Sequence, residues 1–332
     1  MTETRLDVLC IGNAIVDVIS ATDDDFLSAE GLAKGSMRLI DAEEATRLYD
    51  HMGPAREVSG GSAGNTAAGV AMLGGRAGFV GQVADDQLGE VYAHDIQSIG
   101  VEFTTPKSDP DAAPTARCLV LVTPDAQRTM NTFLGAAQNL ESHSIDAEQV
   151  RSASILYLEG YLWDPETPRA AMERAIDIAR EAGRKVAFTL SDSFCIDRHR
   201  DGFNGLIDSG RIDILFANEA EILSLTGETE FDSAVAKAGA RVPLLVVTRS
   251  EKGALAVESG NRVEVSAEPV GRIVDTTGAG DLFAAGFLTG HARGRSIEQS
   301  LRMGAIAAAE VISHYGARPE ADLQALVAER LG

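Results

Sequence analysis

The chain is poor in cysteine and has no long apolar run, and each shortage excludes a class of protein. Its three cysteines, Cys10, Cys118 and Cys195, are scattered over 332 residues and form no Cys-x-x-Cys pair. We therefore expect small core residues in a reducing compartment, without a disulfide framework or a zinc site. No apolar run approaches the ~18–20 residues that cross a bilayer, and the first residues lack the apolar region of a signal peptide. These absences predict a cytoplasmic protein with no membrane partner.

Positive charge is also scarce. The chain has 29 lysines and arginines against 50 aspartates and glutamates, which gives a net charge of −21. We expect no nucleic-acid partner, because a general basic surface is what such binding requires. An anionic substrate would need locally placed N–H groups, arginine, lysine or a metal ion.

Several familiar catalytic motifs are missing or incomplete. No Gly-x-x-x-x-Gly-Lys-Ser/Thr loop and no His-Glu-x-x-His pair occurs. A dinucleotide fingerprint fails because Phe283 stands where the third glycine belongs, and residues 12–17 after the first predicted strand read Gly-Asn-Ala-Ile-Val-Asp. Residues 60–64 match a hydrolase elbow around Ser62, but no histidine directly follows a predicted strand. A nicotinamide-dependent enzyme and a serine hydrolase stay open as alternatives.

Strands and helices alternate in the second half of the chain. Strands are predicted there at residues 154–159, 186–190, 213–217 and 244–248. This alternation predicts an α/β fold with a parallel sheet covered by helices. Two other blocks, about 14–57 and 101–133, are strand-rich with little helix. We expect them to join into a small sheet that packs over the main domain as a lid.

Residues 275–281 (Asp-Thr-Thr-Gly-Ala-Gly-Asp) lie between a predicted strand and an apolar, alanine-rich helix. The turn from Gly278 to Gly280 leaves backbone N–H groups uncovered, and the helix start adds unpaired donors, so together they form a site for an anion. Asp281 then opens the helix. A carboxylate beside an anion hole suits a general base. An N-cap aspartate in a glycine turn is the alternative interpretation.

Other candidate residues also follow predicted strands: Gly12, Gly60, Gly61, Asn218 and Thr248. Ligands of parallel sheets bind at the carboxyl ends of strands, so we expect these residues to converge on one edge with the 277–281 turn. Asp17 is either the outward residue of a half-exposed strand that continues from residues 6–12, or a carboxylate that binds hydroxyl groups. The glycines before Asn65 either admit a ligand or allow close helix–sheet packing.

Three motifs occur in order along the chain, at residues 60–65, 218–221 and 275–281. With them the chain resembles the PfkB (ribokinase-like) carbohydrate and nucleoside kinases from end to end. The resemblance implies one ribokinase-like domain over residues 1–332, a three-layer α/β/α fold with a mainly parallel central sheet and a small β-sheet lid. Within the family the chain looks most like adenosine kinases and their bacterial sugar-kinase neighbours.

The resemblance implies phosphoryl transfer from ATP, with Mg²⁺, to a primary hydroxyl group. Asp281 would be the base, and backbone N–H groups of Thr277, Gly278, Ala279 and Gly280 would form the anion hole. Glu221 would place Mg²⁺ through water. Asp275 and Thr277 would line a site for a monovalent cation such as K⁺. The ATP-binding residues implied are Asn218, Thr248, Arg249, Gly253, Thr277, Gly278 and Gly280.

Substrate binding is implied at residues from two regions of the chain: Asp17, Gly61, Ser62, Asn65, Arg128, Asn131 and Phe133. A carboxylate accepts from two vicinal hydroxyls, which suits a furanose diol. Adenosine is the first expectation for the acceptor and a free sugar such as fructose or ribose the second. A non-catalytic ligand-binding relative is a third interpretation. Pairing of lids would give a homodimer, and otherwise the chain would be a monomer.

Overall fold

The main sheet carries nine strands in the order β14-β13-β12-β11-β10-β9-β1-β5-β6 in this computed structural model, which describes residues 4–109, 111–125 and 127–332. Seven of these strands run parallel, and the hairpin β13–β14 is antiparallel. The mainly parallel sheet predicted from the sequence is confirmed. The strands are β1 (Leu6–Ile11), β5 (Ala77–Val80), β6 (Glu102–Phe103), β9 (Ala153–Glu159), β10 (Lys185–Thr189), β11 (Ile214–Asn218), β12 (Leu244–Thr248), β13 (Ala254–Glu258) and β14 (Asn261–Val265).

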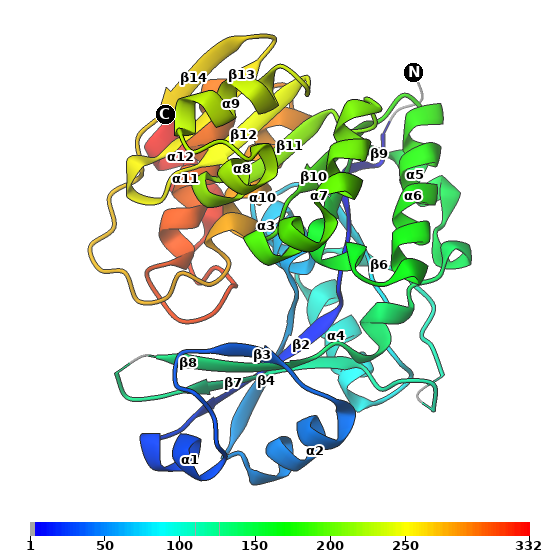
Figure 1. Ribbon diagram of the computed structural model, residues 1–332, viewed down its shortest axis with the longest axis vertical. Coiled ribbons are helices and arrows are strands. Elements are labelled where there is room, and N and C mark those ends of the chain that lie inside the picture. Colours follow the sequence, from blue (N-terminus) through cyan, green and yellow to red (C-terminus); the bar gives the residue numbers. More distant parts are fainter. Residues whose placement is uncertain (1–3, 110, 126) are drawn as a thin grey trace.

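Helices cover both faces of this sheet (Figure 1). Alternate residues of β1 point to opposite faces: Val8 and Cys10 join one apolar core, and Leu9 and Ile11 join the other. The first core lies under α3 (Ser62–Met72), α4 (Gln87–Ser98), α10 (Ala279–Ala292), α11 (Ile297–Val311) and α12 (Leu323–Leu331). The second lies under α5 (Ala147–Ser152), α6 (Glu166–Glu181), α7 (Ser193–Asp208), α8 (Glu219–Thr226) and α9 (Phe231–Gly239). The molecule therefore has the expected three layers.

A second sheet of five strands, ordered β3-β8-β7-β2-β4, forms the lid. Its strands are β2 (Ile15–Ala21), β3 (Met37–Leu39), β4 (Ala55–Gly60), β7 (Ala116–Val122) and β8 (Arg128–Phe133). In Figure 1 it lies below the main domain, with α1 (Asp24–Ala29) and α2 (Ala42–His51) on its far side. Leu27 and Leu48 of these helices share a core with Val16 and Leu119 of the sheet. Odd-numbered residues of β2 face the main domain instead.

The lid differs from its predicted outline in three ways. The chain changes sheets at residues 12–14, so the predicted continuous strand 6–17 is in fact β1 and β2. Strand β4 extends the lid to Gly60, and residues 102–103 belong to the main sheet because Phe103 packs into the core against β5. Alternation shows which residues are buried but not which of two sheets buries them. In the predicted hairpin turn 124–127, Ala126 lies outside the described residues.

Close packing of α10 and α11 sets the position of the cleft. A Cβ atom on Gly286 would lie 2.5 Å from the carbonyl oxygen of Met303, and one on Gly304 would lie 2.7 Å from that of Phe283. The two glycines thus let the helices approach closely, with the apolar residues 282–290 of α10 buried. None of the described helices is long and apolar enough to cross a membrane.

Candidate active site

Two hollows of about 530 Å³ each meet at the carboxyl edge of the main sheet. One lies under the lid and is called the acceptor cavity here. The other lies between α10, α11 and residues 267–273 and is called the nucleotide cavity. The residues that line both are Thr248, Thr276, Ala279, Gly280 and Phe283. The 275–281 motif therefore stands at the junction. The strand predicted to end at residues 273–274 does not form, since no strand lies between β14 and α10 in this fully described stretch.

The glycine turn of this motif requires its glycine. Gly278 is the N-cap of α10 and has a φ of +78°, and a Cβ atom there would lie 2.7 Å from the Cβ of Ala317. Helix α10 begins at Ala279, two residues before the predicted start, so Asp281 lies within its first turn. The N–H of Thr277 donates to Asp275 and that of Ala279 to the carbonyl of Thr276.

This leaves a smaller set of anion-binding donors than the sequence predicted. Among the described residues, the N–H groups of Gly278, Gly280 and Asp281 donate to no protein group. They stand at the positive end of the α10 dipole and border the acceptor cavity. Such a position favours a bound anion.

Asp281 is held in place by two side chains from the start of α3. Ser62 Oγ donates to Asp281 Oδ1 at 2.7 Å, and Asn65 Nδ2 donates to Oδ2 at 2.9 Å. Burial raises the pKa of the Asp281 carboxyl, while these hydrogen bonds and the charge of Arg318 lower it. A buried carboxylate with a raised pKa, fixed beside free N–H donors, is suited to accept a proton at neutral pH.

Asp17 faces Asp281 across the acceptor cavity, from lid strand β2. Gly60 makes room for it, since a Cβ atom on Gly60 would lie 2.5 Å from Asp17 Oδ2. No hydrogen bond from any residue in the described ranges reaches the Asp17 carboxylate. Its pKa is raised to about 6, chiefly by burial, with Arg318 and Arg128 opposing. Of the two interpretations of Asp17, the structure favours a carboxylate available to ligand hydroxyls.

The nucleotide cavity has apolar walls that sequence motifs did not identify. They come from residues of α10, α11 and the preceding loop: Pro269, Val270, Ile273, Phe283, Ala305, Ala308, Ala309 and Ile312. Thr248 and Gly253 lie at its entrance. Arg249 lines a shallower hollow nearby, where its Nε donates to Glu219 and its guanidinium lies 4.0 Å from the ring centre of Phe231.

The three predicted lid residues divide between two faces of β8. Arg128 lines the acceptor cavity, and its guanidinium lies 2.5 Å from Asp275 Oδ2 and 3.3 Å from Thr277 Oγ1. Asn131 lies on the other face, where its Oδ1 accepts from Arg38 Nε. Phe133, also off the cavity, packs over Gly135. The structure therefore brings only Arg128 to the site, because side chains of a strand alternate.

Comparison with known proteins identifies the family. A family model described as the pfkB family carbohydrate kinase matches residues 5–323. The chain belongs to the PfkB family. It is 49% identical to an adenosine kinase from Sinorhizobium meliloti over 99% of this chain and 100% of that one, with a TM-score of 0.90. It is 48% identical to a probable sugar kinase from Rhizobium etli over 98% and 99%, with a TM-score of 0.91.

A fructokinase from Klebsiella pneumoniae is 28% identical over 73% of this chain and 80% of its own length. As a member of the PfkB family, the chain is a phosphotransferase that acts on an alcohol group. The cofactors of PfkB kinases are ATP and Mg²⁺. The ribokinase-like fold and the family expected from the three motifs are thereby confirmed.

Asn218 and Glu221 fit a hydrated magnesium ion. They form a capping box at the start of α8, and both line the acceptor cavity. Burial, with a smaller contribution from the charge of Asp192, raises the pKa of Glu221 to about 7, although the hydrogen bond from the backbone of Asn218 opposes it. A cation placed there would restore the ionised form, and Mg²⁺ keeps several waters and needs few protein ligands. The capping box alone is also a structural motif, so the fit rests on the burial of Glu221 and on its having no cationic partner among the described residues.

The Asp275 carboxylate, predicted to line a monovalent-cation site with Thr277, is bound by groups of the protein. Its Oδ1 accepts from the N–H and hydroxyl of Thr277, and its Oδ2 accepts from the N–H of Gly316 and pairs with Arg128. The guanidinium supplies positive charge at this carboxylate. The K⁺ site at Asp275 and Thr277 stays a prediction.

Several residues of the site carry no motif and were missed. Glu159, at the end of β9, accepts from the N–H groups of Asn13 and Ala63 and so fixes the start of α3. Arg318 lines the acceptor cavity. Their only signal in the sequence is a position just past a strand or helix, which many other residues share.

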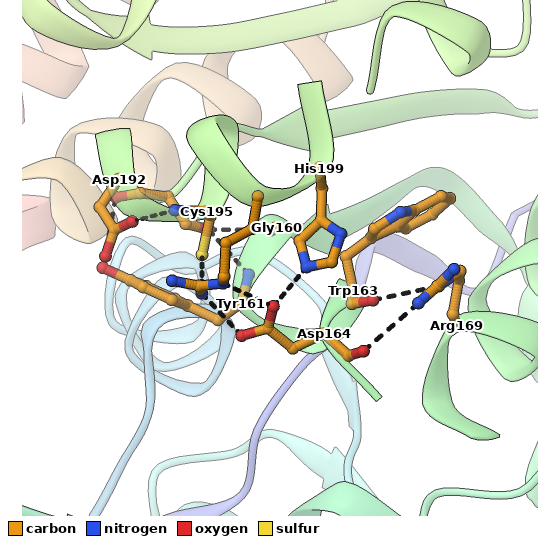
Figure 2. Close-up of polar contacts among 10 residues, drawn as sticks. Gly160, Tyr161, Trp163, Asp164, Arg169, Asp192, Cys195 and His199 are labelled. Atoms are coloured by element: carbon orange, nitrogen blue, oxygen red, sulfur yellow. Dashed lines mark hydrogen bonds and ion pairs between the residues drawn. The ribbon is translucent and has the colours of Figure 1, made fainter. Parts of the chain in front are cut away.

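Tyr161 lies just after β9, beside Asp192 and Cys195 at the start of α7 (Figure 2). Ser191 Oγ accepts from the N–H groups of Gly160 and Tyr161, and the Tyr161 hydroxyl donates to the Ser191 carbonyl. Ser191 has a φ of +72°, which is uncommon for a residue with a side chain. Asp164 pairs with Arg198 and His199 of α7 and secures the segment after Tyr161. Tyr161 and Ser191 line the acceptor cavity together with Asn218 and Glu221.

Proposed function

We propose that this PfkB kinase phosphorylates the primary hydroxyl of a nucleoside, with adenosine converted to AMP as the reaction best supported. The observation that carries the proposal is the position of Asp281. Its carboxylate, held by Ser62 and Asn65, lines the acceptor cavity directly after Gly280, which lines both cavities, and lies within one helical turn of free N–H donors. A hydroxyl in the acceptor cavity and a phosphate at the turn would meet at this point.

The residues of the chain divide the reaction between them. Asp281 takes the proton of the attacking hydroxyl. The N–H groups of Gly278 and Gly280, with the guanidinium of Arg128, stabilise negative charge on the transferring phosphate. Asp17 and the free Oδ1 of Asn65 accept hydrogen bonds from the other hydroxyls of the acceptor. Asn218 and Glu221 would hold magnesium through water, and the ion would supply positive charge for the phosphates.

An apolar wall in the acceptor cavity supports a nucleoside. The inner face of the lid contributes apolar side chains that a purine base would cover, whereas a small polyol would leave them exposed to water. They are Ile15, Ile19, Val58, Val120 and Met130. The similarity to the Sinorhizobium adenosine kinase points the same way. A free sugar is the second candidate, supported by the nearly equal similarity to the Rhizobium probable sugar kinase.

Lid closure and a monomeric state also follow from this arrangement. The ion pair between Arg128 and Asp275 joins the lid to the main domain and excludes water from the transfer. Helices α1 and α2 cover the outer face of the lid sheet, so that face is not available to a second lid (Figure 1). We therefore favour a monomer over a lid-paired homodimer.

One assay tests the proposal. ADP release is measured with Mg²⁺ and ATP over adenosine, cytidine, ribose and fructose, with K⁺ and with the bulky tetramethylammonium ion in its place. We expect adenosine to give the highest kcat/KM. A higher rate with K⁺ would support the predicted cation site at Asp275 and Thr277, and equal rates with either cation would contradict it. A higher kcat/KM for a free sugar would assign the sugar-kinase function instead. ADP release that no acceptor stimulates would contradict both.

A further inference from the structure

Arg318 stands at the centre of the acceptor cavity and has no place in the family motifs. It follows α11 in a short segment that runs along the cavity. Its Nη1 donates to the carbonyl of Gly64 at 3.2 Å, and its Nη2 donates to the carbonyl and hydroxyl of Ser59 at 2.6 and 2.8 Å. These acceptors lie on either side of the glycine turn that begins α3. The guanidinium therefore clamps the turn that presents Ser62 and Asn65 to Asp281.

A carboxylate also holds Ser59, one of the two residues that Arg318 contacts. Asp95 of α4 accepts from the N–H of Ser59 at 2.8 Å and from its hydroxyl at 2.5 Å. Because the Ser59 hydroxyl donates to Asp95, its lone pairs are free to accept from Arg318. Arg318 forms no direct ion pair with Asp281 or Asp17. The carboxylate of Asp95 balances its charge instead, through the Ser59 hydroxyl that both side chains contact.

The charge balance around Asp281 depends on Arg318. The titratable groups that act electrostatically with Asp281 come from β2, β9 and the residues just after β9, and they are Asp17, Tyr157, Glu159 and Tyr161. All of these are acidic groups. Within the described part of the chain, Arg318 is the one cation that lowers the pKa of Asp281, and it shares with Arg128 the same effect on Asp17.

We propose that Arg318 is a positioning residue of the phosphoryl transfer: it fixes the turn that holds Asp281 and keeps Asp281 and Asp17 ionised together in one buried cavity. Two carboxylates in a low-dielectric site disfavour each other's charged form, and a nearby cation offsets this repulsion. The Nε of Arg318 is buried without a hydrogen-bond partner in the described residues. This inference rests on the proposed role of Asp281 as base.

Two substitutions separate the charge from the clamp. Arg318→Gln keeps a donor but removes the charge, whereas Arg318→Lys keeps the charge but loses the forked geometry. Arg117→Gln is the matched control, since Arg117 also has a buried Nε without a partner, but it lies on the outer side of the lid against Thr46 and Tyr49. The measurement is kcat/KM for the acceptor from pH 5.5 to 9, with saturating ATP and Mg²⁺.

We expect the acidic limb of the Arg318→Gln profile to move up by about one pH unit, since a nearby opposite charge lowers a carboxyl pKa by ~1–3 units. Activity would therefore fall about fivefold more at pH 6 than at pH 8. Arg318→Lys should keep the acidic limb of the wild type while its acceptor KM rises, and Arg117→Gln should match the wild type throughout.

An unshifted acidic limb in Arg318→Gln overturns the inference, even if kcat falls at every pH, because a purely structural role lowers activity uniformly. If Arg318→Gln does not fold, Arg318→Lys is the deciding variant. Because lysine keeps the positive charge, a shifted acidic limb in Arg318→Lys would also overturn the inference. The wild-type profile distinguishes failure of the proposed function from failure of the role of Arg318. If the wild type transfers no phosphate to any acceptor, the proposed function fails. An active wild type with an unshifted variant contradicts only the role of Arg318.

Discussion

Buried carboxylates define this site at the scale of single residues. Asp17, Glu159, Glu221 and Asp281 all have raised pKa values, and burial is the largest cause in each case. Groups placed this way cost stability in the free protein and become useful when a substrate hydroxyl or a cation joins them. This pattern distinguishes the cleft from the surface, where carboxylates such as Asp125 pair with lysine and have lowered pKa values.

Asp17 supplies the first prediction. Asp17→Asn removes the charge that accepts the acceptor hydroxyls, and a hydrogen bond to a charged group contributes ~1.5–3 kcal/mol. We expect the acceptor KM to rise at least about tenfold, with the KM for ATP unchanged, in initial-rate measurements. Asp125→Asn is the control, since that aspartate lies on an exposed turn of the same lid. An unchanged acceptor KM would show that Asp17 does not contact substrate.

The sequence predicted some of these residues and not others, for a physical reason. Asp281 and Asp17 were found because each interrupts a local pattern, a glycine turn or a run of β-branched residues. Glu159 and Arg318 interrupt nothing nearby. Arg318 reaches Ser59 across 259 positions of the chain, so only the folded packing of α10 against α3 and α11 reveals its role. The sequence also indicated Asn131 and Phe133 of the lid as substrate contacts. Strand alternation turns both side chains away from the cavity.

At the scale of secondary structure, the start of α10 is the decisive element. Its donors stay free because Gly278 turns the chain with a positive φ directly against Ala317. The sequence predicted this turn from its glycines and its place after an expected strand. It did not predict where the lid strands end, because the same alternation serves both sheets.

Gly278→Ala tests this element. An alanine there would have to adopt a left-handed backbone conformation, which costs free energy. Its Cβ would also lie only 2.7 Å from the Cβ of Ala317. Gly294→Ala is a matched control, with a φ of +72° but no atom within 4 Å of the added Cβ. We expect Gly278→Ala to lower kcat at least about tenfold and to lower the thermal midpoint more than Gly294→Ala does. Equal kinetics and midpoints for the two variants would contradict a shape requirement at the turn.

At the scale of the whole molecule, pH should affect stability and activity in opposite directions. The pKa of Glu159 is raised from 4.5 to about 7, that of Glu221 from 4.5 to about 7 and that of Asp17 from 3.8 to about 6. The folded state therefore binds protons that the unfolded chain has already released. This stabilisation is complete below the unfolded pKa values and is lost as pH rises through the folded ones.

We accordingly expect the ligand-free protein to unfold at a higher temperature at pH 6.5 than at pH 8, while its activity is lower at pH 6.5. His291, whose pKa is lowered to about 4, opposes this trend only below its ordinary value of 6.5. Scanning calorimetry of the wild type and Glu159→Gln measures the effect, and the variant should show a smaller difference between the two pH values. Equal differences would show that Glu159 does not titrate in this range.

The central claim is that Asp281 is the base of the phosphoryl transfer. The most direct measurement compares Asp281→Asn with wild type for acceptor-dependent ADP release and, by calorimetry, for ATP binding. Asp322→Asn alters the N-cap aspartate of α12, a residue that lines neither cavity, and controls for helix capping. The account predicts that Asp281→Asn binds ATP normally and loses at least ~10²-fold in kcat, the usual range for a lost general base. Near-normal turnover by Asp281→Asn, with ATP binding intact, would contradict it.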